Sequence, residues 1–297
     1  MEKLTVEDLK IITRHVSENF PGKIYDDQKT YELARATLQH FLGNNWVKQN
    51  VTNYKENRKG KNFLKTGDFV AENQFRHQLR VMQLAELIFN LQEFDGVEER
   101  VEKIRQGDLE PFYGELECVA QIKKANLTFS FVFPSGNRGK DYDMEIMFSL
   151  GDKLNCEIEV TTEEKDLKQS AILNKLKGAK RQLPKGQPGM IFLKIPESWP
   201  KQPDSQAIIN ESLTRFLRDT NRVIAVVLRW EEFIMDLSKA NPAVLKILFR
   251  IEANTASEFY NSEIENILLQ INNSPGKDWI RFRDIVKQIS ADGNRLK

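Results

Sequence analysis

The stretch GKDYDMEIMFSLGDKLNCEIEVTTEE, residues 139–164, decides the fold expected for this chain. Apolar and polar residues alternate over 142–150 and again over 154–160. Because side chains alternate between the two faces of a strand, the pattern predicts two strands, each with one apolar and one polar face. A hairpin through GDK at 151–153 would join them. The polar faces carry many carboxylates, so we ask what neutralises them.

Matching the two apolar faces predicts a register for this hairpin. With a three-residue turn, Ile146 pairs with Ile158, and Glu145 then lies opposite Glu159. Asp143 would lie diagonal to Glu159, opposite Thr161. Like charges directly opposite each other destabilise a sheet when nothing compensates. We therefore expect a positive group at this face. The alternative is a solvated outer face that water and lysines neutralise.

The elements around the hairpin favour a sheet covered on its faces. Periodicity predicts the order αβββαβαβ, with a lysine-rich helix after the third strand and two strongly apolar strands later. In a covered sheet a divalent cation with oxygen ligands, such as Mg²⁺, is the economical partner for the carboxylates. The expected bounds are 115–125 (helix), 127–133, 142–150 and 154–160 (strands), 165–183 (helix), 189–195 (strand), 205–220 (helix) and 222–230 (strand).

Helical periodicity fills both flanks of this core. Residues 1–113 are predicted to form a helical N-terminal region, and residues 236–297 a helical C-terminal extension. The run AVLKILFRI at 243–251 belongs to that extension and is expected to be helical. The core itself spans 114–235.

Composition narrows the class of protein. The 297 residues carry a net charge of +1, so any nucleic-acid contact must come from a local basic patch. The charged start MEKLTVEDLK and the absence of a long apolar run predict a cytoplasmic protein without membrane segments. Cys118 and Cys156 form no CxxC pair and are expected in the core. His15, His40 and His77 lack metal-ligand spacing and are expected at the surface or its boundary.

A family resemblance rests on three short motifs. They are Glu115 in YGELECVA, Asp143 in GKDYDMEI and Glu159 in CEIEVTT. Together with the order αβββαβ, they resemble the PD-(D/E)XK nuclease superfamily over residues 114–230. The resemblance implies an α/β protein with a mixed sheet, the restriction-endonuclease-like fold. The order αβββα also occurs in double-stranded RNA-binding domains, but the later strands and the acidic sheet argue against that class.

The resemblance implies hydrolysis of phosphodiester bonds in DNA or RNA with Mg²⁺ or Mn²⁺. Asp143 and Glu159 would be metal ligands, and Glu157 an alternative or additional ligand. Glu115, on the first helix of the core, would reach the metal or position its water. The ordinary interpretation of Glu115 is a first-turn acid near a helix N-terminus.

The lysine of the family pattern is missing from its usual place. Two residues after the strand acid stands Thr161 if the acid is Glu159, or Glu159 itself if the acid is Glu157. Lys168, or secondarily Lys165, could supply the ammonium from the next helix. The alternative is a catalytically degenerate protein that binds nucleic acid or other proteins, with the helical N-terminal region recruiting a protein partner.

Overall fold

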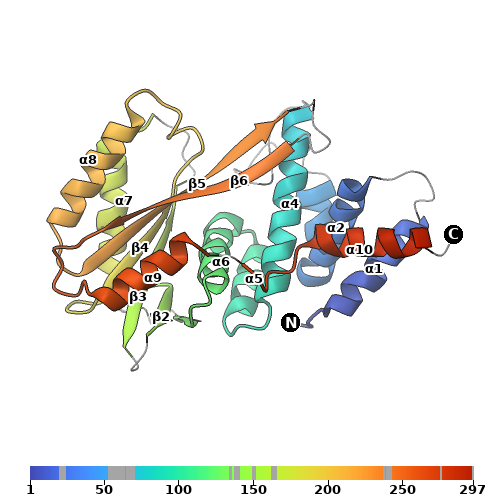
Figure 1. Ribbon diagram of the computed structural model, residues 1–297, viewed down its shortest axis with the longest axis horizontal. Coiled ribbons are helices and arrows are strands. Elements are labelled where there is room, and N and C mark those ends of the chain that lie inside the picture. Colours follow the sequence, from blue (N-terminus) through green and yellow to red (C-terminus); the bar gives the residue numbers. More distant parts are fainter. Residues whose placement is uncertain are drawn as a thin grey trace. The chain divides into compact units, whose positions relative to one another are not determined.

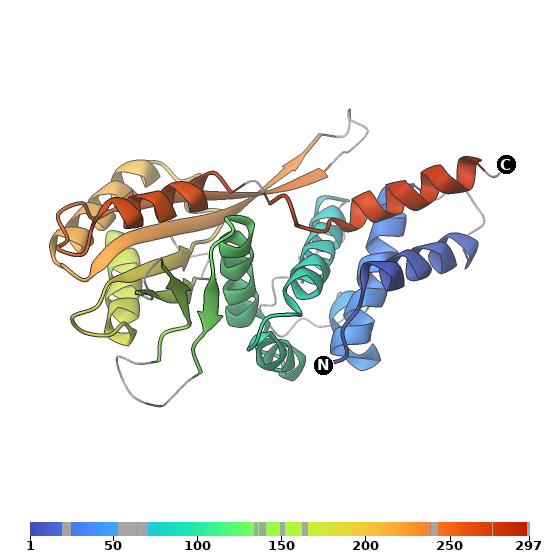
Figure 2. The same cartoon turned by 60° about the horizontal axis from the view of Figure 1, so that its bottom comes forward.

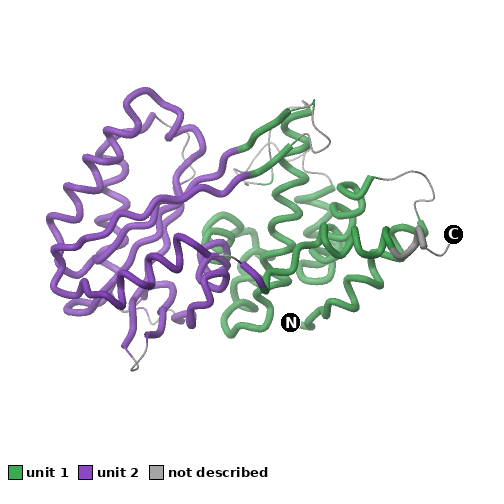
Figure 3. The backbone as a smooth tube through the Cα atoms, viewed as in Figure 1, with its two compact units in different colours: residues 1–116, 233–245, 278–297 green, residues 117–232, 246–277 purple. Residues whose placement is uncertain are grey.

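The computed structural model describes most of the chain and separates it into two compact units. Unit 1 comprises 1–116, 233–245 and 278–297, and unit 2 comprises 117–232 and 246–277 (Figure 3). None of the described helices is long and apolar enough to cross a membrane. The described residues are 1–19, 25–52, 64, 71–133, 136, 141–148, 152–161, 166–236, 238, 243–274 and 276–295.

Unit 1 is built mainly from helices with a shared apolar core (Figure 1). Thr5 and Asp8 cap the first helix reciprocally, since the Thr5 hydroxyl accepts from the Asp8 N–H at 3.1 Å and Asp8 accepts from the Thr5 N–H at 2.7 Å. The predicted helices of this region are present. Their bounds are α1 (Val6–Asn19), α2 (Asp26–Leu42), α3 (Asn44–Val47), the π-helical turn η1 (Lys48–Thr52), α4 (Ala71–Leu91), α5 (Val97–Gln106), the start of α6 (Leu109–Lys124) and α10 (Phe282–Arg295).

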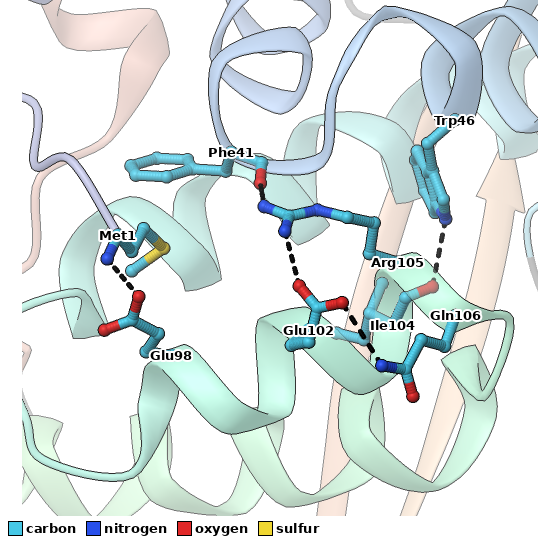
Figure 4. Close-up of polar contacts among 8 residues, drawn as sticks. All are labelled: Met1, Phe41, Trp46, Glu98, Glu102, Ile104, Arg105 and Gln106. Carbon is cyan, nitrogen blue, oxygen red and sulfur yellow. Dashed lines mark hydrogen bonds and ion pairs between the residues drawn. The ribbon is translucent and has the colours of Figure 1, made fainter.

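Polar contacts fasten α5 to the segment around the end of α2 (Figure 4). Arg105 donates to the carbonyl oxygen of Phe41 at 2.6 Å. The indole N–H of Trp46 donates to the carbonyl oxygen of Ile104 at 3.0 Å. Both acceptors lie near helix ends, where carbonyl groups lack their usual helical partner. The Ile104 oxygen also accepts the backbone N–H of Gly107 at 3.1 Å, so the indole adds a second hydrogen bond to it.

His77 of α4 differs from its expected place at the surface or boundary. It is only 1% exposed, and its Nδ1 and Nε2 lie 2.8 Å and 3.2 Å from the carbonyl oxygens of Leu64 and Val51. A neutral imidazole has one N–H, which donates to one of these two carbonyl oxygens, and this hydrogen bond helps the core to tolerate the histidine. His15 and His40 are exposed, as expected.

Unit 2 contains most of a six-stranded mixed sheet in the order β1-β2-β3-β4-β5-β6. The β1–β2 and β2–β3 pairs are antiparallel, whereas β3–β4 and β4–β5 are parallel. The predicted order αβββαβαβ is confirmed from α6 to β5. The bounds are β1 (Phe129–Phe131), β2 (Met144–Met147), β3 (Lys153–Val160), α7 (Gln169–Gln182), β4 (Gly189–Lys194), α8 (Ser205–Arg218), β5 (Val223–Met235), β6 (Ala243–Ala253) and α9 (Ser262–Asn272).

Two helices cover one face of this sheet. The connections α7 and α8 pack on Ile191, Leu193 and Leu228 and form the apolar core there (Figure 2). The neighbouring residues Lys194 and Arg229 point to the opposite face, because side chains alternate along each strand. Cys118 and Cys156 are free and buried, which confirms their assignment to the core.

The predicted hairpin register is wrong by four residues. Ile146 pairs with Leu154 rather than Ile158, and Glu145 lies opposite Asn155 rather than Glu159. Leu150, the last residue of the strand expected at 142–150, lies outside the described residues. A shift by an even number of residues keeps every side chain on its face, so alternation could not distinguish the two registers. The predicted pair of directly opposed glutamates therefore does not exist.

The predicted helix at 243–251 is also wrong. These residues form β6, which lies beside β5 at the edge of the sheet and runs in the opposite direction (Figure 1). A mostly apolar run with Lys246 and Arg250 four residues apart suits a strand as well as a helix, and periodicity alone does not separate them. The rest of the tail is helical as predicted, in α9 and α10.

Candidate functional site

Asp143 stands immediately before β2 and is fixed by β3. Its Oδ2 accepts the backbone N–H of Ile158 at 2.7 Å, and its own N–H donates to the carbonyl oxygen of Cys156 at 3.1 Å. Pairing of the two strands ends at Met144, so the carboxylate replaces the backbone acceptor that a longer β2 would offer. This bond places Asp143 beside the part of β3 that carries the predicted ligands.

Glu157 and Glu159 lie on the sheet face that α7 covers. They pair in register with Ile191 and Leu193 of β4, which contact α7 and α8. Glu157 is 7% exposed. Two carboxylates two residues apart on one strand face, with a third next to that strand, form what we call the acidic face: Asp143, Glu157 and Glu159.

The lysine that meets the acidic face is Lys175, in the middle of α7. Its Nζ lies 3.2 Å from Oε2 of Glu159. Gly178, one turn later, also lies beside Glu159, since a Cβ built there would be at an ordinary contact distance of 3.6 Å from Oε1 of Glu159. Lys175 was not predicted from the sequence as the missing lysine. The signal for it is a lysine in the helix that follows the acidic strand, at a position that faces the sheet.

The predicted lysines are placed elsewhere or not described. Lys168 is exposed at the N-cap of α7, and Lys165 lies outside the described residues. At the motif position, Thr161 is 8% exposed and its N–H donates to the carbonyl oxygen of Lys194 at 2.9 Å. Its buried hydroxyl oxygen has no hydrogen-bond partner among the described residues. A buried polar atom without a hydrogen-bond partner is uncommon in native proteins, so Thr161 is an unusual position in this chain.

Glu115 is engaged in unit 1. Its Oε2 lies 2.8 Å from Nε of Arg100 in α5, and both side chains are buried. Burial raises the pKa of Glu115, and the charge and hydrogen bond of Arg100 offset part of that increase. The geometry therefore assigns this carboxylate to an ion pair, which is neither of the two interpretations offered by the sequence.

A second charged cluster lies between α6 and the sheet, and the sequence did not reveal it. We call Glu117, Lys194, Arg229 and Glu231 the buried quartet. Lys194 lies 2.6 Å from Glu117 and 2.8 Å from Glu231, and Arg229 lies 3.0 Å from Glu117. Burial disfavours the charged form of Lys194, but Glu117 and Glu231 outweigh that effect and raise its pKa. The available signal was a charged residue at the end of each apolar strand.

The buried quartet balances its charges internally. Two carboxylates face two cations, and both carboxylates are at most 5% exposed. Neutralised and mostly inaccessible, these groups suit a structural role rather than ligand binding. We therefore take the acidic face, not the quartet, as the candidate site.

No family model, curated protein or solved structure matches this chain. Within the described ranges, no group of three or more His, Cys, Asp or Glu side chains is arranged to hold a metal ion. The function must therefore be argued from the chain's own residues.

Proposed function

We propose that this chain is a divalent-metal-dependent phosphodiester hydrolase acting on DNA or RNA, with its site at the acidic face. The observation that supports the proposal is the position of Asp143, whose carboxylate is hydrogen-bonded beside the segment that carries Glu157 and Glu159. The PD-(D/E)XK resemblance calls for carboxylates at these positions, and in this proposal the core around them is restriction-endonuclease-like.

The acidic face fits Mg²⁺ or Mn²⁺ in the chemistry of its donors. Mg²⁺ usually takes one or two protein carboxylates and keeps several waters, so it needs no larger cluster. Asp143 and Glu159 would supply the oxygens, with Glu157 as the alternative or additional ligand. A bound Mg²⁺ would act as a Lewis acid on a phosphate oxygen.

The chain's own cation would come from α7. Lys175 already lies 3.2 Å from Glu159, and an ammonium on a flexible stem can turn from a carboxylate to a phosphate. Lys175 thus replaces Lys168 as our candidate for the missing lysine. It would hold negative charge as it develops on the phosphate during hydrolysis.

Calorimetric titration with Mg²⁺ and Mn²⁺ tests the metal site directly. We expect wild type to bind, and Glu157→Gln and Glu159→Gln each to abolish binding. Glu145→Gln is the matched control, because Glu145 is a nearby β2 carboxylate already held by Lys153 at 2.6 Å. Absence of binding in wild type, or equal losses in all three variants, would contradict the site.

A nuclease assay on mixed single- and double-stranded DNA and RNA tests the activity. We expect cleavage with metal and none with EDTA. Lys175→Met should lower the cleavage rate by about 10²-fold while leaving metal binding in place. Lys168→Met serves as the control and should cleave like wild type.

The second candidate function is a degenerate nuclease fold that serves as a nucleic-acid-binding or protein-interaction module. It is favoured by the partners that the carboxylates already have: Glu159 pairs with Lys175, and Asp143 bonds to the backbone. Such a module would bind nucleic acid without metal and with a steep salt dependence. A purely protein-binding module would bind neither metal nor nucleic acid, and its partner would contact the helical N-terminal region.

A further inference from the structure

The last strand of the sheet has an edge that no described strand covers. β6 pairs with β5 on one side only, and its 11 residues are mostly apolar. None of them is buried, and Val244 and Ile247 are 44% and 36% exposed. An exposed apolar edge strand is a template for another strand, because its outward N–H and C=O groups lack partners.

One hydrogen bond shows which residues direct their backbone outward. The N–H of Asn254 donates to the carbonyl oxygen of Ile224 in β5 at 2.7 Å. Backbone groups alternate in direction along a strand. Phe249, Ile251 and Ala253 therefore present their N–H and C=O groups at the free edge.

We propose that β6 pairs antiparallel with β6 of a second copy of this chain, about a two-fold axis at Phe249. Phe249 then lies opposite Phe249 of the second copy, and Ile247 lies opposite Ile251. The hydrogen bonds between the copies are made by the residues whose backbone groups point outward. The six-stranded sheet becomes one sheet that continues through both copies.

Charge and the length of the overlap together select this register among the symmetric ones, because centring on Ile251 also sets Arg250 opposite Glu252 but overlaps only residues 249–253 of β6. A two-fold axis perpendicular to the sheet keeps each residue on its face, so the axis must pass through a residue. Centred on Leu248, the pairing sets Lys246 opposite Arg250, and centred on Arg250 it sets that arginine opposite itself. Centred on Phe249, Lys246 lies opposite Glu252 twice. Opposite charges in cross-strand positions stabilise a sheet.

The free chain is consistent with this pairing. Lys246 is exposed and has no ion-pair partner among the described residues. Oε2 of Glu252 lies 2.7 Å from Arg250 of the same strand, and the second carboxylate oxygen can accept a hydrogen bond from Lys246 of the other copy. A lysine on an edge strand commonly discourages pairing, but here the symmetric register gives it a carboxylate. The opposite edge, β1, has only three residues and offers a much shorter template.

Cross-linking tests the two-fold axis. Phe249→Cys should yield a covalent dimer with a short bismaleimide, because only a residue on the axis faces its own copy. Ala253→Cys is the control, since its two copies would be about 26 Å apart along the strands. Burial leaves Cys118 and Cys156 inaccessible and raises the pKa of Cys118 to about 12, so neither native thiol reacts.

Analytical sedimentation of the full chain tests whether the Lys246–Glu252 pairs stabilise the dimer. We expect a dimer whose dissociation constant rises about tenfold in Lys246→Glu, and falls back in the double variant Lys246→Glu/Glu252→Lys. Lys287→Glu is the matched charge control, because Lys287 is exposed on α10. A monomer at every concentration, equal cross-linking at 249 and 253, or no response to Lys246→Glu would overturn the proposal. Binding of an extended peptide along β6 of a monomer would also overturn it.

Discussion

At the scale of single residues, Asp143 illustrates how a metal-ligand candidate can also be structural. Its Oδ2 accepts the N–H of Ile158, and losing that acceptor would leave a backbone donor unsatisfied. Asp143→Ala should therefore lower the free energy of unfolding by about 1–3 kcal/mol. Asp143→Asn keeps an acceptor oxygen and should cost less, yet it removes the charge needed for Mg²⁺. Urea unfolding with calorimetry on both variants separates the two roles, and equal stability losses would contradict this account.

Lys194 should be much more sensitive than a surface lysine. Lys194→Met leaves Glu117 and Glu231 buried without the ammonium that pairs with both of them, and should cost about 3–5 kcal/mol of unfolding free energy. Lys153→Met is the control, because Lys153 is 49% exposed and its pair with Glu145 should contribute less than about 1 kcal/mol. Chemical denaturation measures both. Similar losses in the two variants would mean that the quartet is not a buried ionic unit.

At the scale of elements, β6 can be tested by proline substitution. The bond from Asn254 to Ile224 implies that the N–H of Leu248 points toward β5 and that of Ile247 points outward. Leu248→Pro should therefore remove a ladder hydrogen bond and lower the free energy of unfolding by about 1–3 kcal/mol. Ile247→Pro should cost clearly less, since edge strands tolerate proline where the N–H faces away. Thermal unfolding compares them, and a helix at 243–251 would instead respond about equally to both.

The elements also show what periodicity could and could not predict. The order from α6 to β5 followed from the change between periods of 3.6 and 2. The register of β2 against β3 did not, because Ile146 meets an apolar partner in either register. β6 was missed because its basic residues Lys246 and Arg250 stand four apart, a spacing that places them on one face of a helix and equally on one face of a strand. The helices α9 and α10 have a clear amphipathic period and were predicted correctly.

At the scale of the whole molecule, the buried thiol of Cys118 makes the free energy of unfolding depend on pH in the alkaline range. The folded-state pKa of Cys118 is raised to about 12 from 9.0, chiefly by burial. Below about pH 9 the thiol is protonated in both the folded and the unfolded chain, and its full contribution to the free energy of unfolding is present. Between about pH 9 and pH 12 only the unfolded chain ionises, so this contribution is lost. Stability should fall by about 1.4 kcal/mol per pH unit from this thiol.

Comparison with Cys118→Ala isolates the effect. The difference in unfolding free energy between wild type and variant should shrink with that slope above about pH 9 and stay constant below it. Urea titrations across this range provide the measurement. Parallel pH profiles for the two proteins would show that the thiol is already accessible in the folded chain.

The sequence by itself determined the mixed α/β class, the order of most elements and the carboxylates worth considering, because these depend on local alternation and spacing. Only the tertiary structure decided the register that removed the predicted opposed glutamates, the engagement of Glu115 by Arg100, the contact of Lys175 with Glu159, and the buried quartet. Each of these joins residues far apart in the chain. Their pairing depends on how the elements pack, and no periodicity within one element encodes it.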